Sequence, residues 1–404
     1  MGSIRVDADL LIPGRGEPIE SGSVVMEGSR ISYVGSTDGA PEAGSTTSVK
    51  TVMPGIWECH GHLLGLTNPD VLPGSLSNPI AERAARATRD MKTFLMTGIT
   101  SVREPGGLGI DLRHAVDDGS VIGPSIYSAG QILSTTGGHA DVHAYPLDFV
   151  TSHPHALGLV CDGVSECLKA VRTNLRRGAA LIKICASGGV MSEIDHPIHQ
   201  QFSAEELRAI VEEAGRAERS VAAHCHGKPG IMAAIEAGVK TIEHGSYLDE
   251  EAAEAMVETD TILVPTRFVI AELLKMEDVL PPHGYRKGVM VSEHHERAMK
   301  IAVAAGVKMA TGTDIIMSGD LFNKATREIA YLIEAGLPPI DAIEAATANG
   351  PETIGEQAPL SGQLKEDYDA DVIALDFDPL DDWSKWGDPD RVTHVWKAGE
   401  AVKA

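Results

Sequence analysis

The chain has few cysteines, few aromatic residues and no long apolar run. Its five cysteines are scattered and contain no CxxC pair, so neither a zinc ribbon nor a disulfide framework is indicated. No stretch approaches the roughly 18 consecutive apolar residues of a membrane span. The start, MGSIRVDADLLIPG, lacks a basic segment followed by an apolar one, which predicts no secretory signal. These absences favour a reducing cytoplasm, with Cys59 and Cys225 as small apolar packing groups.

Basic residues are also scarce. Lysine and arginine total 34 against 58 acidic residues, giving a formal net charge of −24. Such a field repels phosphate backbones, so nucleic acid is a poor partner, and the charge is interpreted as a solubility feature. The hydrophobic content of 43% is ordinary for a globular protein, and the aromatic content is 4%.

Both ends of the chain read as short strands separated by turns. Neither end has enough strands for a core of its own. We therefore expect residues 1–51 and 359–404 to form one composite β-sandwich domain. The central segment, residues 52–358, would then be inserted between its halves.

The central segment alternates strand and helix patterns. Eight strand candidates follow one another: TVMPGIWE, GITSVRE, SIYSAG, ALIKICAS, SVAAHCH, TIEHG, TILVPT and KMATGTD. The helical run FSAEELRAIVEEAGRAE opens with Ser203 and has Glu206 three residues later, a capping box. Eight strands alternating with helices predict an α/β fold, a (β/α)8 TIM-like barrel with its active site at the carboxyl ends of the strands. Residues 131–180 and 267–300 contain polar stretches expected to be long loops, with His294 and His295 solvated on the second.

Potential metal ligands stand at the ends of these strands. His60 and His62 are two residues apart, as are His224 and His226, and residues at that spacing point to the same face of a strand. TIEHG adds His244 and TGTD adds Asp314. So many ligand types after successive strands predict a metal-dependent hydrolase. The residue chemistry alone leaves open whether His224 or His226 is the ligand.

Lys183 lies within the apolar run LIKIC. A bare ammonium buried there would pay a desolvation penalty of several kcal/mol unless it were paired. It could extend its stem to the barrel mouth, or lose its proton and react with carbon dioxide. The resulting carbamate would be a two-oxygen ligand able to bridge two cations. A single lysine does not decide between these alternatives.

Three motifs supply the missing context: ASGGVMSEIDHPIHQQFSAEELRAIVEEA, TTGGHAD and VAAHCHGKPGIMAAIEAGVKTIEHG. With the ligand series, they resemble the amidohydrolase superfamily, in particular binuclear members with a carboxylated lysine. The resemblance covers nearly the whole chain. It is closest to the branch of Xaa-Pro dipeptidases and metallocarboxypeptidases, which is related to ochratoxin-hydrolysing amidases.

The resemblance implies a role for each ligand position. His60, His62 and Asp314 would hold one divalent ion, His224 and His244 the second, and carboxylated Lys183 would bridge both. Zn²⁺ suits nitrogen and carboxylate ligands, and manganese or cobalt could replace it. A hydroxide bridging the two ions would attack the amide carbon. His226 would stabilise the developing oxyanion, and Asp314 would carry the proton to the leaving amine.

The implied substrate is a dipeptide or an N-acyl amino acid that loses its C-terminal residue, and ochratoxin A fits this chemistry. Candidate substrate contacts are His139, Tyr247 and Arg267. The resemblance also implies a homo-oligomer, an octamer in this branch. Two alternatives stay open: a mononuclear ring hydrolase or deaminase of the imidazolonepropionase type, which lacks the bridging lysine, and a scaffold that has lost its metals.

Overall fold

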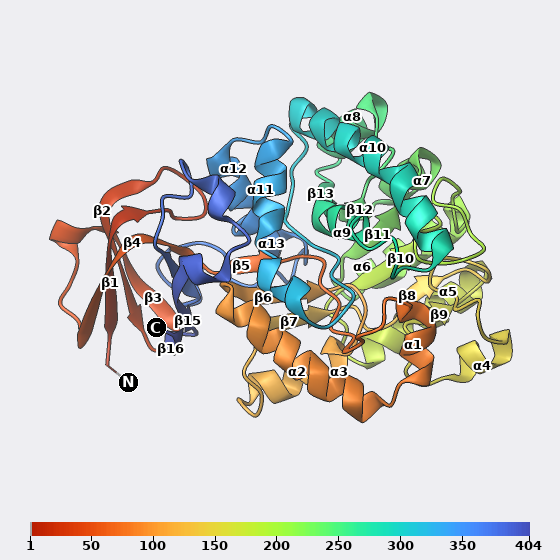
Figure 1. Ribbon diagram of the computed structural model, residues 1–404, viewed down its shortest axis with the longest axis horizontal. Coiled ribbons are helices and arrows are strands. Elements are labelled where there is room, and N and C mark those ends of the chain that lie inside the picture. The colour runs from red at the N-terminus through yellow and green to blue at the C-terminus, as the bar shows by residue number, and fades with distance from the viewer. Residues whose placement is uncertain (1) are drawn as a thin grey trace.

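The computed structural model describes residues 2–404 and has two parts (Figure 1). One part is a seven-stranded sheet drawn from both ends of the chain, which lie near each other in Figure 1. Its strands, in spatial order, are β16 (Glu400–Lys403), β15 (Val392–Lys397), β14 (Val372–Leu375), β4 (Ser45–Pro54), β1 (Ile4–Leu11), β2 (Ile19–Glu27) and β3 (Arg30–Ser36).

The two ends of the chain meet where β14 pairs with β4. This pairing is antiparallel, with Ile373 opposite Met53, while β1 and β4 are parallel. One apolar cluster joins the two halves and includes Val24 from β2 and Trp396 from β15. The terminal segments therefore combine as expected, because strands from both of them belong to one seven-stranded sheet.

The central part contains short parallel strands. One group orders β5 (Ile56–Glu58), β6 (Ile99–Glu104) and β7 (Ser125–Ser128). A second orders β13 (Ile262–Val264), β12 (Thr241–His244), β11 (Val221–Cys225), β10 (Ile182–Cys185), β8 (Ile132–Ser134) and β9 (Gly158–Val160). Parallel pairing places the carboxyl ends of neighbouring strands along the same edge.

The segment KMATGTD was predicted as the eighth strand. Instead it makes one isolated bridge, Leu263 with Met309. The backbone nitrogen of Leu263 donates to the Lys308 carbonyl at 2.9 Å, and that of Cys59 donates to the Thr311 carbonyl at 2.8 Å. The stretch thus touches β13 on one side and the residue after β5 on the other. A few backbone hydrogen bonds to each neighbour, rather than a regular ladder, hold it in place; they include Ala310 N to the Leu263 carbonyl at 3.0 Å and Asp314 N to the His60 carbonyl at 2.7 Å.

Helices separate most of the parallel strands. They are α1 (Val71–Ser77), α2 (Ile80–Met96), α3 (Gly109–Asp117), α4 (Leu147–Ser152), α5 (Gly163–Arg176), α6 (Ala204–Gly215), α7 (Lys228–Ala237), α8 (Glu250–Glu258), α9 (Arg267–Leu273), α10 (Pro282–Ala305), α11 (Arg327–Glu334), α12 (Pro339–Ala346) and α13 (Asn349–Glu352). The capping box at α6 is present, because Ser203 and Glu206 exchange side-chain and backbone hydrogen bonds. Leu207, Ile210 and Ala214 of that helix are buried, as their spacing predicted.

The expected loop over residues 267–300 is wrong. That stretch contains α9 and most of α10. His295 lies on the inner face of α10, fully buried, with Nε2 at 2.6 Å from the Pro265 carbonyl. The run reads as polar because one face of α10 meets solvent, and because its buried face mixes Gly284, Gly288, Ser292 and His295 with Val291, Ala298, Met299 and Ala302.

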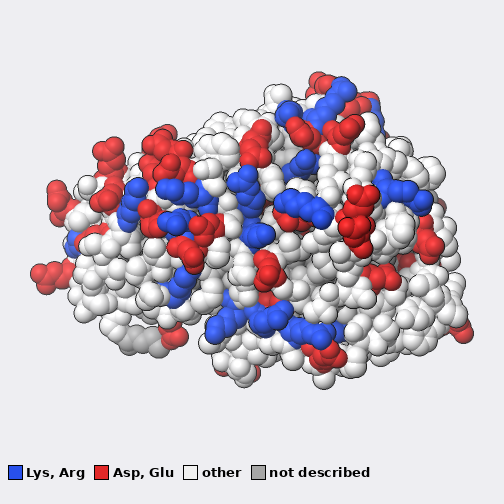
Figure 2. Space-filling view, viewed as in Figure 1, with Lys and Arg blue, Asp and Glu red and all other residues white. Residues whose placement is uncertain are grey.

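No helix among residues 2–404 is long and apolar enough to cross a membrane. Figure 2 shows acidic and basic side chains interspersed over the terminal sheet and the helices beside it. All five cysteines are buried and unpaired, and Cys59 and Cys225 pack in apolar clusters as expected.

Candidate metal centre and active site

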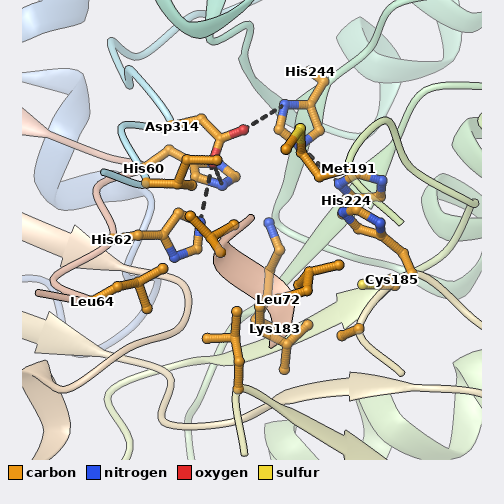
Figure 3. A pocket seen from close by; sticks show the side chains of 16 residues that line it. His60, His62, Leu64, Leu72, Lys183, Cys185, Met191, His224, His244 and Asp314 are labelled. Carbon is orange, nitrogen blue, oxygen red and sulfur yellow. Dashed lines mark hydrogen bonds and ion pairs between the residues drawn. The ribbon is translucent and has the colours of Figure 1, made fainter. Parts of the chain in front are cut away.

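A cavity of about 600 Å³, open to solvent, lies where the parallel strands end. The close view in Figure 3 shows histidines, Asp314 and Lys183 on its polar side and aliphatic side chains on the other. Its lining consists of His60, His62, Leu64, Val71, Leu72, Ile132, His139, Ala140, Leu157, Lys183, Cys185, Met191, His224, His244, Asp314 and Ile316.

The first group of candidate ligands is His60, His62 and Asp314, whose ligand atoms lie within 4.8 Å of one another. Asp314 Oδ1 is 3.2 Å from His62 Nε2 and 3.6 Å from His60 Nε2. Burial acts to raise the pKa of the Asp314 carboxyl, but the charge and hydrogen bonding of the two histidines lower it overall. The carboxyl is therefore ready to act as an anionic ligand.

The second group is His224, His226 and His244, again within 4.8 Å of one another. His244 Nε2 is 2.9 Å from His224 Nδ1, and the His226 ring stacks on the His244 ring with centroids 4.8 Å apart. Burial is the main cause that lowers the pKa of each of the three rings. Neutral imidazole is the form that binds a metal ion.

Hydrogen bonds to carbonyls and a carboxylate fix which ring nitrogen of three histidines is free. His62 Nδ1 lies 2.5 Å from the Gly106 carbonyl, and His224 Nε2 lies 3.1 Å from the Gly188 carbonyl. A carbonyl only accepts, so those nitrogens carry the proton and the opposite nitrogens keep their lone pairs.

His60 follows the same rule, because its Nδ1 is 2.6 Å from Glu243 Oε2. The lone pairs of His60 and His62 therefore face Asp314, while that of His224 faces His244. This is the arrangement that histidine ligands adopt around a metal ion. The residues present fit two cation sites.

Lys183 lies between the two groups in Figure 3. It is 2% exposed, and its Nζ is among the buried polar atoms that have no hydrogen-bond partner. Burial is the main cause that lowers the pKa of its amine, which favours the neutral form. Burying an amine without a hydrogen-bond partner costs free energy of folding, so this position is unfavourable for an unmodified lysine.

A buried ionic network beneath the histidines was not expected from the sequence. Arg103 contacts Glu243 at 2.6 Å and Thr241 Oγ1 at 2.8 Å, and all three side chains are fully buried. Burial raises the pKa of Glu243, but the Arg103 charge and others lower it well below its usual range. The signals were charged residues inside otherwise apolar strands, Arg103 in GITSVRE and Glu243 in TIEHG.

Three residues at the site have left-handed backbone angles although none is glycine. The φ values are 68° for His244, 55° for Thr266 and 55° for Asp314. This conformation costs of order 1–3 kcal/mol per residue and persists where the surroundings hold it. His244 Nδ1 is in turn 2.7 Å from Thr266 Oγ1, so two of these residues support each other.

Of the three expected substrate contacts, one lines the cavity and two do not. His139 lines the cavity and stacks on His224 with centroids 4.3 Å apart. Tyr247 does not line it: its ring stacks on His294 of α10. Arg267 also turns to α10, where it contacts Ser292 at 3.3 Å. Sequence could not show this, because α10 was taken for a loop.

Comparison with known proteins places the chain in a family. Residues 51–402 match the model of the amidohydrolase family. Ochratoxinase of Aspergillus niger is 43% identical over 98% of this chain and 86% of that protein. Imidazolonepropionase of Rhodococcus jostii is more distant, at 23% identity over 95% of this chain and 88% of that protein.

Solved structures agree with this placement. The crystal structure of A. niger ochratoxinase has a TM-score of 0.95 and 41% identity, covering 100% of this chain and 96% of that one. A prolidase complexed with N-methylphosphonate-L-proline has a TM-score of 0.91 and 33% identity, covering 99% of both chains. A Xaa-Pro dipeptidase with bound methionine has a TM-score of 0.89 and 30% identity over 100% of both. The chain therefore belongs to the amidohydrolase family and is a metal-dependent amide or peptide hydrolase.

Proposed function

We propose that this enzyme releases a C-terminal amino acid from dipeptides or N-acyl amino acids, ochratoxin A among them, with two divalent ions in its centre. His60, His62 and Asp314 would hold one ion, and His224 and His244 the other. Zn²⁺ is the ion best matched to these nitrogen and carboxylate donors. When bound, the pair would activate a shared water as a bridging hydroxide and polarise the scissile carbonyl.

The observation that carries the binuclear proposal is the unpartnered Nζ of Lys183, buried between the two ligand groups. Carboxylation by carbon dioxide needs a neutral amine, and burial favours that form. The carbamate would be a monoanion whose charge is shared by two oxygens, and it would lie between the two groups. Its negative charge would balance part of the positive charge of two cations.

Asp314 and His226 are proposed as the proton-handling groups. Asp314 would take a proton from the attacking water and deliver it to the leaving nitrogen, which an amide requires because an amide anion leaves poorly. His226 Nδ1 is 2.7 Å from Ser246 Oγ, which orients the ring. Its Nε2 would donate to the carbonyl oxygen as negative charge develops there.

His139 is proposed to contact the substrate, because it is the expected contact that lines the cavity. For Tyr247 and Arg267 we propose a supporting role, since both side chains are engaged with α10. The aliphatic wall formed by Leu64, Leu72 and Leu157 would receive an apolar acyl group or side chain.

We further propose that residues 52–358 close into a (β/α)8 barrel and that residues 1–51 with 359–404 form a composite β-sandwich domain. Two contacts support closure. The segment 308–311 touches both β13 and the end of β5. Ala180, just before β10, donates its backbone nitrogen to the Ser128 carbonyl of β7 at 2.8 Å, which links the two parallel groups.

A homo-oligomer, specifically an octamer, is also proposed. Exposed large apolar side chains support association with other copies: Phe149 is 43% exposed and Ile194 is 74% exposed. Light scattering of the purified protein measures the assembly directly.

The test of the function is a substrate panel with a metal count. N-acyl amino acids, Xaa-Pro dipeptides and ochratoxin A would each be incubated with the enzyme before and after chelation. Release of the C-terminal amino acid, its loss on chelation and two metal ions per chain are expected. No cleavage of any C-terminal amide would refute the substrate class, and one ion per chain would favour the mononuclear alternative.

Lys183→Ala separates the carbamate from the other ligands. This variant should hold fewer than two ions and lose activity. Short carboxylic acids added to it should restore part of the activity by occupying the vacated space. Full activity with two ions in Lys183→Ala would disprove the bridge.

A further inference from the structure

The loop between β10 and α6, residues 186–203, covers one side of the cavity. Met191 from this loop lines the cavity, and the Gly188 carbonyl contacts His224 Nε2. Ser192 Oγ lies 2.8 Å from Nδ1 of His139. A Cβ on Gly189 would stand 2.1 Å from the His139 ring, so the loop backbone is pressed against that ring. The position of His139 therefore depends on the position of this loop.

Lys287 of α10 holds the loop through its ammonium. Its Nζ donates to the carbonyls of Ser192 at 2.8 Å and Gly189 at 3.2 Å, and also to the carbonyl of Asp195. These three acceptors match the three N–H groups of an ammonium. The Lys287 side chain is only 14% exposed and lies 3.5 Å from Asp195 Oδ1, a carboxylate that is 5% exposed.

Neighbouring residues on the same face of α10 complete the contact. His283, one turn before Lys287, has Nε2 at 3.1 Å from the Met191 carbonyl. At Gly284 an added Cβ would be 3.2 Å from the Met191 sulfur, so the helix passes close to the Met191 side chain. Asp195 closes the loop on itself, because its Oδ2 accepts the Gly189 backbone nitrogen at 2.8 Å.

We propose that Lys287 is a positioning residue for substrate binding: it fixes residues 189–195, and through Ser192 it sets the orientation of His139 in the cavity. Lys287 touches neither the candidate metal ligands nor the cavity. Its loss should weaken substrate binding more than the chemical step. The inference rests on the proposed function, in which His139 contacts the substrate.

The kinetic test uses Lys287→Met, which keeps the length of the stem and removes the three donors. With an N-acyl amino acid as substrate, KM should rise at least about tenfold while kcat stays within about threefold and metal content is unchanged. The matched control is Lys300→Met on the same helix, because the Lys300 side chain is 57% exposed and its ammonium pairs with Glu296. It should behave like the wild type.

Two further variants show that Lys287 acts through the loop. Ser192→Ala should raise KM by itself. Adding Lys287→Met to Ser192→Ala should raise KM by a smaller factor than Lys287→Met does in the wild type, because both residues act on His139 through the same contact. Alkylating Lys287→Cys with bromoethylamine places an ammonium at about the same distance from the backbone as in lysine. This treatment should return KM most of the way to the wild-type value. Wild type treated in parallel controls for its own thiols.

Hydrogen exchange gives a readout that does not need activity. Amides of residues 188–196 should lose protection in Lys287→Met but not in Lys300→Met. Unchanged protection, or an unchanged KM, would overturn the positioning role. A rise in KM accompanied by losses of kcat and of bound metal, without recovery on alkylation, would also overturn it. If the wild type cleaves no C-terminal amide, the proposed function fails while the exchange result still decides the role of Lys287 in the loop.

Discussion

Glu243 Oε2 lies 2.6 Å from His60 Nδ1 and the same oxygen lies 2.6 Å from Arg103, so one buried carboxylate orients a candidate ligand and neutralises a buried guanidinium. The next residue in the chain, His244, belongs to the other ligand group. The end of β12 thus serves both ligand groups. It supplies His244 to one group, and Glu243 holds His60 of the other.

Glu243→Gln should therefore weaken metal binding and stability together. Loss of an outer carboxylate of this kind lowers metal affinity by roughly 10–100-fold. The unpaired Arg103 charge should cost about 3–5 kcal/mol of unfolding free energy. Competition with a chelator and urea unfolding measure the two effects. Glu251→Gln, at an exposed side chain on α8, is the control, and equal behaviour of the two variants would contradict the prediction.

The buried carboxyl of Glu328 should make stability fall as pH rises. Burial is the main cause that raises its pKa to about 8. The hydrogen bonds that it accepts from the backbone nitrogens of Arg267 and Phe268 act in the opposite direction. Between the unfolded pKa near 4.5 and the folded value, the folded chain holds the proton and the unfolded chain does not. This contribution is complete below pH 4.5 and is lost by pH 8, at about 1.4 kcal/mol per pH unit.

Urea unfolding from pH 5 to pH 9 measures this slope. Glu328→Gln should lower stability at every pH, because its amide nitrogen cannot accept one of the two backbone bonds, yet it should show a shallower decline. Comparing the two proteins cancels the pH dependence of metal binding. Parallel curves would show that Glu328 does not titrate in this range.

The aliphatic wall of the cavity should select for large apolar groups. Leu72→Ala removes part of that wall, so KM should rise about 5–30-fold for N-octanoyl-phenylalanine, the equivalent of about 1–2 kcal/mol. For N-acetyl-phenylalanine the rise should be smaller. Leu147→Ala, at a side chain 44% exposed on α4, is the control. An equal change for both substrates would show that Leu72 does not contact the acyl group.

None of the five cysteines should react with a thiol reagent while the protein is folded. All are buried, and burial raises the pKa of Cys59 and Cys185 to about 12, so little thiolate forms at pH 8. Unfolding in guanidinium should expose five thiols per chain. A fast-reacting thiol in the native protein would contradict this, and the cavity residue Cys185 would be the first one to examine.

Sequence predicted best where a residue's role follows from its neighbours along the chain. The i and i+2 histidines at strand ends come together as expected, and the Ser203 capping box forms. The pairing of both termini in one sheet was also expected, because neither end could bury a core alone. For the histidine pairs and the capping box, a local pattern is sufficient to determine the outcome.

Sequence failed where a partner lies far away in the chain. Tyr247 and Arg267 follow strands, but their side chains contact His294 and Ser292 of α10, a helix that was expected to be a loop. Arg103 and Glu243 are 140 residues apart, so neither signals the other. The eighth strand was overestimated because its residues make a few irregular hydrogen bonds to two neighbours instead of a regular ladder.

The terminal sheet has a consequence for synthesis. Strand β4 lies between β1 and β14, and β14 begins at Val372. At about 5–20 residues per second, β4 leaves the ribosome tens of seconds before its second neighbour exists. During that interval one edge of β4 is open to pairing with other chains. Crowded expression should therefore favour aggregation of nascent chains, and slower initiation should relieve it more than any change near the cavity.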